Sequence, residues 1–474
     1  LSWAEPGLLR RQIVLCASRQ FAQGDVQHWW HAPQGAGVRT HISDDLLWLP
    51  HACVRYLLAT GDMALLDEAV PFIEGDEIPA GAEDAYYVPR VSTQTASVYE
   101  HAALTIDRRL RVGVHGLPLM GSGDWNDGMN RVGAQGRGES VWLGWFLCHL
   151  VRDFAPLARS RGEAARAGQW EAAAAGWKSA LNTTAWDGEW FKRAFFDDGQ
   201  ALGTRTAAEG RIDLIAQAWS VLSGAAPAEL QEQALAAVRR HLVDDEAGLV
   251  RLLHPPFAQA RPSPGYVQAY PAGVRENGGQ YAHAGVWALM AQAQAAVHGP
   301  STQADGMDGA DLAYRWFTYL SPAHRACHPA WGAAYGLEPY VVAGDVHAGA
   351  HAGRGGWSWY TGAAGWLHRA AVESILGLRQ GAETLSFQPC LPPHWDRAEL
   401  TLRRDGRVMR FILLRADTQQ ARRAAGSLDA ALLHPGQPLR WHGLADGSTF
   451  VVPLPLAAAQ AQPAGPDMTV AVQP

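Results

Sequence analysis

Gly121-Ser-Gly-Asp-Trp-Asn-Asp-Gly-Met-Asn130 is the stretch around which the rest of the sequence is organised. Its glycines and serine prevent a long helix, so we expect a tight loop. The loop holds two carboxylates, Asp124 and Asp127, beside an indole and two amides. Indoles stack on pyranose rings, acids and amides bind hydroxyls, and an acid can protonate a glycosidic oxygen. The loop therefore predicts a sugar site, against the simpler alternative of a polar turn capped by Asp side chains.

The composition is that of a large globular protein. The 474 residues are 48% hydrophobic and 18% charged, with a formal net charge of −7. That length exceeds one ordinary core but is short for three domains. The sequence contains no basic run, so nucleic acid is not an expected partner. It contains no run of 18 apolar residues that could span a membrane.

The numbers and positions of tryptophan and cysteine residues give further information on the kind of protein and its compartment. Twenty tryptophans predict stacking platforms or aromatic layers between helices. The five cysteines are scattered and lack C-x-x-C spacing, which indicates a reducing, cytoplasmic compartment and argues against a disulfide framework or a zinc site. The sequence begins with Leu and shows no signal-peptide pattern, so we expect a piece of a longer chain.

Apolar periodicity predicts ten to twelve helices, mostly in pairs and joined by uneven Gly- and aromatic-rich loops. The main ones are expected at residues 8–23, 46–60, 97–108, 139–151, 163–181, 211–223, 227–242, 282–296, 304–320 and 361–378. Residues 75–95 are expected to be irregular, and residues 186–198 to form a hairpin. No fixed repeat supports a solenoid, so we favour a closed ring of helix pairs whose loops meet at one mouth.

Strand-like alternation replaces the helical pattern from about residue 382. We therefore expect a helical domain over residues 1–380 and a small β-sheet domain over residues 381–456. The tail at residues 457–474 is rich in Ala, Gln and Pro and is expected to be flexible.

Two further clusters carry candidate sugar ligands. Arg39 and Asp45 lie six residues apart around a predicted helix start, and they form either a simple ion pair or part of a sugar- or anion-binding cleft. The segment Arg275-Glu-Asn-Gly-Gly-Gln-Tyr-Ala-His283 gathers an acid, amides and an imidazole around two glycines. We favour function there over helix capping, although His283 alone is compatible with a core histidine. Glu338 and Asp345 near a buried run are compatible with structural roles.

Gly353-Arg-Gly-Gly-Trp-Ser-Trp-Tyr-Thr-Gly362 is the second strong signal. Thr361 and Gly362 stand where an apolar helix begins. A hydroxyl and free N–H groups at a helix start bind anions, so phosphate is a candidate ligand, and a plain threonine N-cap is the alternative. The P-loop pattern G-x-x-x-x-G-K-[ST] is absent from the sequence.

Taken together, these segments resemble the glycoside phosphorylases of glycoside hydrolase family 94, the cellobiose and chitobiose phosphorylase family. The amino-acid sequences of the motifs resemble most the phosphorylase-like C-terminal domain of cyclic β-1,2-glucan synthases. The resemblance rests on segments that occur in order between residues 20 and 380, namely residues 24–31, 39–50, 121–130, 136–143, 211–219, 276–283, 338–341 and 353–366.

The resemblance implies a mainly α protein, an (α/α)6 barrel or six-hairpin toroid followed by a small C-terminal β-sheet domain. It implies inverting phosphorolysis of β-glucosides or β-glucans to a sugar 1-phosphate, with inorganic phosphate as co-substrate and no cofactor or metal. By motif position, Asp127 is the expected general acid. The other expected site residues bind sugar (Arg39, Asp45, Asp124, Trp125, Glu276 and Gln280) or phosphate (His283, Thr361 and Gly362).

The implied mechanism is physically coherent. Phosphate is already an anion, so its attack needs no general base and one carboxylic acid suffices. We expect Asp127 to lie in an apolar, Trp-lined pocket that favours its protonated form. The family's N-terminal β-sandwich is not part of this sequence, and a fragment without it is expected to fold but to bind weakly.

Two alternatives remain open. The chain is either an inverting (α/α)-barrel hydrolase with Glu276 or Glu338 as base, or a non-catalytic module that binds glucan or controls its chain length. The resemblance is compatible with fusion to, or association with, a membrane glucan synthase on its cytoplasmic face, and with a homodimer. The sequence does not fix the linkage or the sugar.

Overall fold

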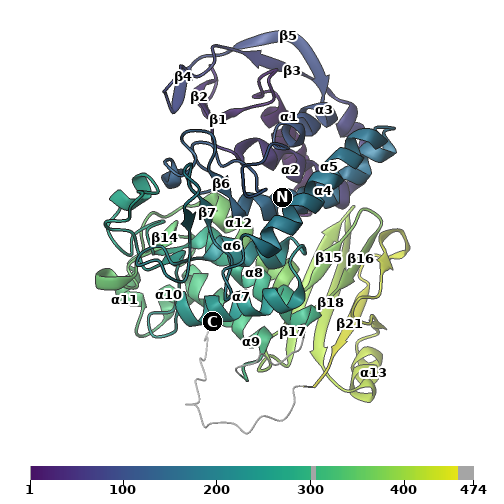
Figure 1. Ribbon diagram of the computed structural model, residues 1–474. Coiled ribbons are helices and arrows are strands. Elements are labelled where there is room, and N and C mark those ends of the chain that lie inside the picture. Colours follow the sequence, from purple (N-terminus) through teal and green to yellow (C-terminus); the bar gives the residue numbers. More distant parts are fainter. Residues whose placement is uncertain (1, 300–305, 457–474) are drawn as a thin grey trace.

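The computed structural model describes residues 2–299 and 306–456, and it places a helical region beside a C-terminal region built on sheets (Figure 1). The helices are α1 (Pro6–Ala17), α2 (Trp48–Thr60), α3 (Val98–Asp107), α4 (Val141–Ser160), α5 (Ala164–Thr183), α6 (Leu214–Leu222), α7 (Ala228–His241), α8 (Ala282–His298), α9 (Gly309–Leu320), α10 (Pro322–Cys327), α11 (Gly332–Tyr335), α12 (Thr361–Arg369) and α13 (Thr418–Ser427).

The helices pack as sequential pairs around a central group. Helices α4 and α5, α6 and α7, and α8 and α9 pack against each other, and α2, α4, α6, α8 and α12 contact one another in succession. The sequence explains these boundaries: Ser140 caps α4 by accepting from the Leu143 N–H at 3.0 Å, and Gly61 ends α2 in the left-handed conformation with φ 71°. The closed ring of six pairs stays a prediction.

Several stretches differ from the sequence expectation. The first helix ends at Ala17, because Gln20 and Phe21 instead form β-bridges with Val26 and Ile73. Two strands, β4 (Asp84–Tyr87) and β5 (Arg90–Ser97), occupy the stretch expected to be irregular. After α12 the chain continues as a π-helical turn, η6 (Ala370–Ile375). The expectations for residues 300–305 and for the tail at 457–474 lie outside the described residues.

Small sheets surround the helices. Strand β2 (Ala36–Thr40) pairs with β1 (Gln27–His31) on one side and with β4 on the other, and β3 (Ala69–Glu74) pairs with β5. The remaining strands of the helical region have two residues each: β6 (Glu139–Ser140), β7 (Ala194–Phe195), β8 (Ala201–Leu202), β9 (Ile212–Asp213), β10 (Val243–Asp244), β11 (Leu249–Val250), β12 (Leu253–His254), β13 (Gln280–Tyr281) and β14 (Asp345–Val346). They close loops that lead into the central helices.

The C-terminal region contains two sheets. One has the order β15–β16–β20, formed by β15 (Leu378–Gln380), β16 (Thr384–Phe387) and β20 (Leu439–Arg440). The other has the order β17–β18–β21–β19, formed by β17 (Arg397–Arg404), β18 (Arg407–Arg415), β21 (Thr449–Leu454) and β19 (Ala431–Leu432). Helix α13, which the sequence analysis did not anticipate, packs on β19 and β21.

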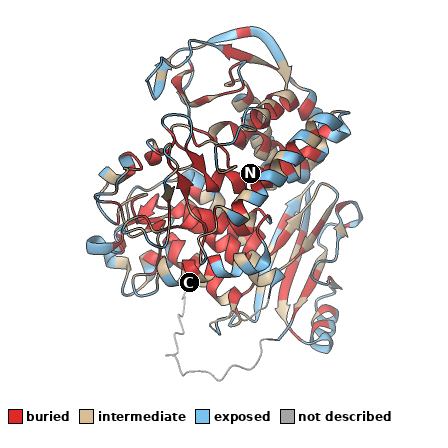
Figure 2. Ribbon diagram, in the orientation of Figure 1, coloured by how far each residue is buried: buried red, intermediate tan, exposed pale blue. Residues whose placement is uncertain are grey.

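An aromatic core runs through the centre of the helical region, where Figure 2 shows buried residues concentrated. The Trp287 ring lies 6.0 Å from that of Trp142, 5.2 Å from that of Trp219 and 5.4 Å from that of Trp125. This arrangement confirms the predicted aromatic layers between helices. It also connects the core to the loop at residues 121–130.

All five cysteines are free thiols. Among the described residues, no helix combines the length and apolar character needed to cross a membrane.

Candidate active site

The loop at residues 121–130 is fixed from beneath by a buried ion pair. Asp124 is 0% exposed and accepts hydrogen bonds from both terminal nitrogens of Arg193, at 2.7 and 2.5 Å. Ser140 Oγ donates to Asp124 at 2.6 Å, and the Asn126 N–H donates at 3.1 Å. Both carboxylate oxygens are therefore engaged by the protein, and Asp124 anchors the loop that presents the residues after it.

Glycine and asparagine set the shape of this loop. Gly121 has φ 66°, and a Cβ there would lie 2.0 Å from the His41 carbonyl oxygen, so no other residue fits without moving the backbone. Asn126 accepts from the Gly128 N–H at 3.1 Å and caps the short 3-10 helix η3 (Asp127–Met129). The general acid expected from the sequence is therefore the first residue of a capped turn.

One imidazole joins two of the predicted site carboxylates. His28 Nδ1 lies 2.9 Å from both oxygens of Asp45, and His28 Nε2 lies 3.4 Å from Asp127 Oδ2. Burial by itself would lower the pKa of His28, but the hydrogen bonds and charges of Asp127 and Asp45 outweigh it and raise the pKa to about 10. His28 is therefore a cation at neutral pH, and it lies between the side chains of Asp45 and Asp127.

A cavity of about 400 Å³ brings together residues from three distant segments. Its lining includes five of the predicted site residues, Trp125, Glu276, His283, Thr361 and Gly362. The volume lies within the range of small-ligand sites. An indole, a carboxylate, an imidazole and a helix N-terminus thus share one cavity.

His283 is a neutral ring with a defined tautomer. The Trp125 indole N–H donates to His283 Nδ1 at 3.2 Å. Because an indole N–H can only donate, Nδ1 is the acceptor nitrogen and the proton lies on Nε2. Burial lowers the pKa of His283 to about 3, so the ring stays uncharged at neutral pH. Its buried Nε2 has no hydrogen-bond partner within the described residues, which marks an N–H without an acceptor.

The start of α12 presents further donors. Tyr360 precedes the helix and its side chain caps no N–H group. Thr361 is the first helical residue and is exposed, as is Gly362, and a Cβ on Gly362 would meet open space. The alternative of a threonine N-cap is therefore wrong, and the first-turn N–H groups of α12 face the exposed end of the helix.

Glu276 enters the cavity with a guanidinium beside it. Arg275 Nε donates to Glu276 Oε2 at 3.2 Å. Arg275 has φ 52°, a strained value for a residue with a Cβ, and its N–H donates to Asp345 Oδ2 at 2.8 Å. The Arg275 guanidinium carbon lies 4.1 Å from the centroid of the Trp357 ring. Asp345 thus has a structural role, and it fixes the backbone of Arg275, the cation beside Glu276.

Asp127 is not among the residues that line this cavity, but its charge and that of the lining residue Glu276 reach a common group, Tyr270. Burial raises the pKa of Tyr270, Arg275 lowers it, and the charges of Glu276 and Asp127 add to the increase. Both carboxylates therefore act on one hydroxyl. Within residues 2–299 and 306–456, no group of three or more His, Cys, Asp or Glu side chains could hold a metal ion.

Arg39 and Asp124 do not reach the site as expected. Arg39 is 3% exposed, and its Nε donates to Asp25 Oδ2 at 2.6 Å, so its ion pair is with Asp25 and not with Asp45. Asp124 is enclosed by the contacts with Arg193 described above. The polar atoms of both side chains are engaged inside the protein, and their direct contact with sugar stays a prediction.

Gln280 is likewise engaged inside the protein, so its sugar contact also stays a prediction, whereas the environment of Asp127 differs from the expected one. Gln280 is 1% exposed; its oxygen accepts from the Val250 N–H at 2.8 Å and its amide donates to the Tyr319 carbonyl at 3.0 Å. The Asp127 side chain is 44% exposed and faces the His28 cation. The expected apolar enclosure of Asp127 is therefore wrong in this structure.

Sequence reasoning missed His28 and Arg275 as site residues. His28 lies within residues 24–31, one of the segments that carry the family resemblance, but its two partners, Asp45 and Asp127, are remote in sequence. The neighbouring Glu276 drew attention instead of Arg275, whose left-handed backbone only the structure reveals. Both residues lie inside motifs that already contain, or adjoin, an expected ligand, and that position is the sequence signal that could have identified them.

Family models match nearly the whole described chain. Residues 1–377 match the glycosyl hydrolase 94 superfamily catalytic domain, and residues 378–441 match the glycosyl hydrolase family 65 C-terminal domain. A solved structure of a sialidase shares the fold over 79% of this chain and 30% of its own, with a TM-score of 0.50 and 12% identity.

Curated relatives agree with these matches. Cyclic β-(1,2)-glucan synthase NdvB of Rhizobium meliloti is 46% identical over 86% of this chain, and solabiose phosphorylase of Paenibacillus borealis is 31% identical over 83%. The 1,2-β-oligoglucan phosphorylase of Listeria innocua is 23% identical over 85%. The chain spans 14%, 47% and 37% of the lengths of these three proteins.

Proposed function

The chain belongs to the glycosyl hydrolase 94 superfamily, and from that membership we propose that it is a phosphorylase-type glycosyltransferase domain. In this proposal it cleaves a β-linked gluco-oligosaccharide with inorganic phosphate and inverts the anomeric configuration. The products are a sugar 1-phosphate and an oligosaccharide shortened by one unit. No general base is required, since phosphate is itself the nucleophile.

The observation that carries this proposal is the cavity that joins a sugar-type surface to an anion-type surface. Trp125 and Glu276 supply an indole face and a carboxylate for sugar hydroxyls. His283 Nε2 supplies a buried N–H without an acceptor, and Thr361 and Gly362 stand at the positive end of α12. A phosphate oxygen is the partner that we propose for these donors.

The proposed reaction follows from these positions. A phosphate oxygen attacks the anomeric carbon, the bond from that carbon to the glycosidic oxygen breaks, and Asp127 gives its proton to the departing oxygen. The carboxylate left on Asp127 faces the His28 cation at 3.4 Å, which stabilises it. Asp45, on the other side of His28, is the proposed partner for hydroxyls of the sugar whose bond is cleaved.

The relatives support narrower proposals. One is named as a β-(1,2)-glucan synthase and another as a 1,2-β-oligoglucan phosphorylase, so we place β-1,2-linked glucans first among the candidate substrates. We further propose an (α/α)6 ring for the helical region, because its central helices contact one another in succession. Finally, we propose that this domain works as one part of a longer, cytoplasmic chain that resembles a glucan synthase.

The test is release of glucose 1-phosphate from β-1,2-gluco-oligosaccharides and from cellobiose, with and without phosphate. Asp127→Asn is compared with the wild type, and Asp153→Asn, which removes a carboxylate paired with Arg152, serves as control. Phosphate-dependent release that only Asp127→Asn abolishes supports the proposal. Free glucose without phosphate indicates a hydrolase, and oligosaccharide binding without turnover indicates a non-catalytic module.

A further inference from the structure

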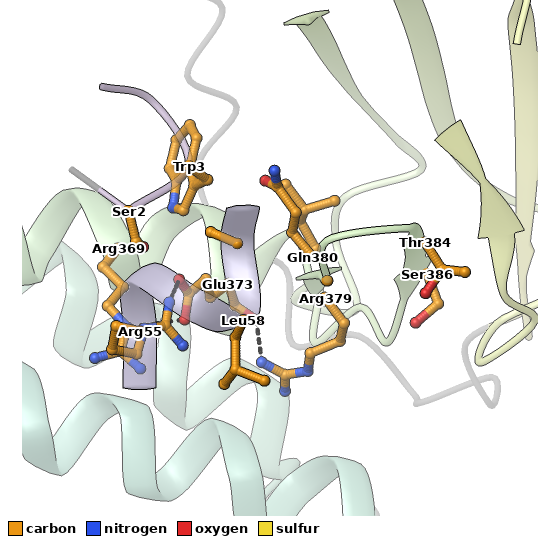
Figure 3. A pocket seen from close by; sticks show the side chains of 13 residues that line it. Ser2, Trp3, Arg55, Leu58, Arg369, Glu373, Arg379, Gln380, Thr384 and Ser386 are labelled. Carbon is orange, nitrogen blue, oxygen red and sulfur yellow. Dashed lines mark hydrogen bonds and ion pairs between the residues drawn. The ribbon is translucent and has the colours of Figure 1, made fainter. Parts of the chain in front are cut away.

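We propose that the junction between the helical region and the first C-terminal sheet holds a second anion site, one for a phosphate-type oxyanion. The site lies around Glu373 of η6, where Arg55 of α2, Arg369 of α12 and Arg379 of β15 converge (Figure 3). None of these residues belongs to the proposed catalytic cavity. The inference stands independently of the proposed reaction.

Charge is unbalanced at this junction. Glu373 accepts from Arg55 Nη2 and, at 2.8 Å, from Arg369 Nε. The Arg379 guanidinium reaches the same turn by donating to the Glu373 backbone carbonyl at 2.9 Å. Three guanidinium groups thus surround one carboxylate, and within residues 2–299 and 306–456 no other carboxylate pairs with them, which leaves two positive charges uncompensated in a partly buried place. Such an excess is costly unless an anion or water offsets it.

The arginines keep donors free for a ligand. Among the described residues, Arg55 donates only through Nη2 and Arg369 only through Nε. Their other nitrogens are not among the buried polar atoms that lack a partner, so these donors face open space rather than the protein interior. Guanidinium groups with free N–H pairs bind phosphate oxygens in bidentate geometry.

Two cavities open onto this cluster. One has a volume of about 340 Å³, the other about 320 Å³, and both are lined by Arg369, Glu373 and Arg379. The first also receives Thr384 and Ser386, which point from β16 toward the space (Figure 3). A phosphate group leaves most of such a volume unfilled, and these hydroxyls suit the hydroxyls of an attached sugar. The chemistry fits inorganic phosphate and sugar phosphates alike.

The site is separate from the catalytic cavity, although α12 connects the two. Thr361 begins α12 at the catalytic cavity and Arg369 ends it at this junction. The nine residues of α12 place these ends roughly 12 Å apart at 1.5 Å per residue. The two sites can therefore be filled and removed independently.

The test measures phosphate binding by calorimetry at constant ionic strength set with chloride, and repeats it with glucose 1-phosphate. The proteins are the wild type, Arg379→Gln, Thr361→Val and the double variant, with Arg422→Gln on the exposed face of α13 as control. We expect two phosphates per wild-type chain. Arg379→Gln removes a charged donor, so one of the two phosphates should bind about tenfold or more weakly in that variant. The other phosphate should bind more weakly in Thr361→Val.

The outcomes separate the two proposals. If Arg379→Gln retains every binding event of the wild type while its thermal unfolding is unchanged, the second site is refuted. If Thr361→Val alone changes nothing, the phosphate pocket of the proposed reaction is refuted and the second site stands. Whichever of the two compounds, phosphate or glucose 1-phosphate, binds more tightly to the second site is identified as its ligand.

Should Arg379→Gln fail to fold, wild-type crystals soaked in tungstate give an independent answer. Anomalous density beside Arg55 and Arg379 supports the site. Density confined to the start of α12 refutes it.

Discussion

His28 and His149 are two partly buried imidazoles with similar exposure, 23% and 18% of their side chains, yet their pKa values move in opposite directions. Burial lowers both. At His28 the carboxylates of Asp127 and Asp45 outweigh burial and raise the pKa to about 10. At His149 burial prevails over the nearby Asp153, with help from Arg152, Arg369 and Arg55, and the pKa falls to about 4.

The difference teaches that two places in the molecule carry opposite fields. At the negative end of the comparison, the His28 cation lies between the carboxyl groups of Asp45 and Asp127. At the positive end, by the last residue of α12, one carboxylate lies among three guanidinium groups. A negative surplus favours a proton donor and a cation, whereas a positive surplus favours an anion. Each of the following experiments breaks or sharpens that contrast.

Removing the lone carboxylate at the positive end should have the largest effect. Glu373→Gln leaves three guanidinium groups without a counter-charge, and the Glu373 side chain is only 11% exposed. We expect a loss of about 3 kcal/mol in the free energy of unfolding. Urea unfolding in phosphate-free buffer measures it.

Glu399→Gln is the matched control, because Glu399 also lies between two arginines, Arg397 and Arg410, but is 35% exposed. It should cost less than about 1 kcal/mol. Equal losses for the two variants would show that the field at the junction is no different from that of the open surface.

Removing the lone cation at the negative end should reduce turnover. His28→Gln displaces Asp127 and Asp45, and we expect kcat for phosphorolysis to fall roughly tenfold to a hundredfold. The pKa of His28 is about 10, so its contribution to the wild-type rate should be lost as pH rises through about 10, and the alkaline limb of the pH–rate profile should change in His28→Gln.

His149→Gln is the control at the positive end and should leave the profile in place. An unchanged alkaline limb in His28→Gln, whatever its kcat, would reduce His28 to a merely structural residue.

The two imidazoles should also give opposite pH dependences of stability. The folded pKa of His28 is raised, so its contribution is complete below about pH 6.5, the pKa of an unfolded histidine, and is lost as pH rises through about 10. The folded pKa of His149 is lowered, so the wild type loses stability as pH falls from about 6.5 towards 4.

Each contribution should be on the order of 1 kcal/mol, since both side chains are partly solvated. The measurement is the difference in unfolding free energy between the wild type and each glutamine variant, at intervals from pH 4 to 10. Parallel curves for His28→Gln and His149→Gln would contradict the opposite fields.

The smallest effect is expected at the start of α12. Gly362→Ala introduces a methyl group into open space, so the fold should be unaffected, but the group intrudes on the proposed phosphate position. We expect the KM for phosphate to rise about threefold, comparable with the loss of a weak helix-terminus contact. Initial rates at varied phosphate concentration measure it.

Gly426→Ala on α13 meets equally open space and serves as the control. A KM that stays the same in both variants would move the phosphate away from this turn.

The sequence predicted the helical pairs, the C-terminal sheets and the five residues that share one cavity, because each lies in a short segment with its own local signal. Trp125 and Glu276 lie in short segments rich in glycine, and Thr361 lies at the start of an apolar helical pattern. Local patterns of this kind survive folding, since turn chemistry and helix starts are decided within a few residues.

What the sequence left open depended on contacts between remote segments. Asp124 and Asp127 look equivalent three residues apart, yet one is enclosed by Arg193 and the other faces solvent and His28. Gln280 occupies a motif position but bonds to the backbone of two other segments. No pattern within a motif can tell a residue that binds the ligand from one that holds the motif in place.

The anchoring of the loop at residues 121–130 has a consequence for how this protein can evolve. Its placement depends on Asp124, Arg193 and a glycine that touches the His41 carbonyl, whereas Trp125 and Asp127 take no part in that anchor. Mutations at 125 can therefore explore new sugars without dislodging the acid, but a change at 124 must be matched at 193. For the same reason the loop is suitable for engineering: position 125 can be randomised in a library while Asp124 and Arg193 are kept constant.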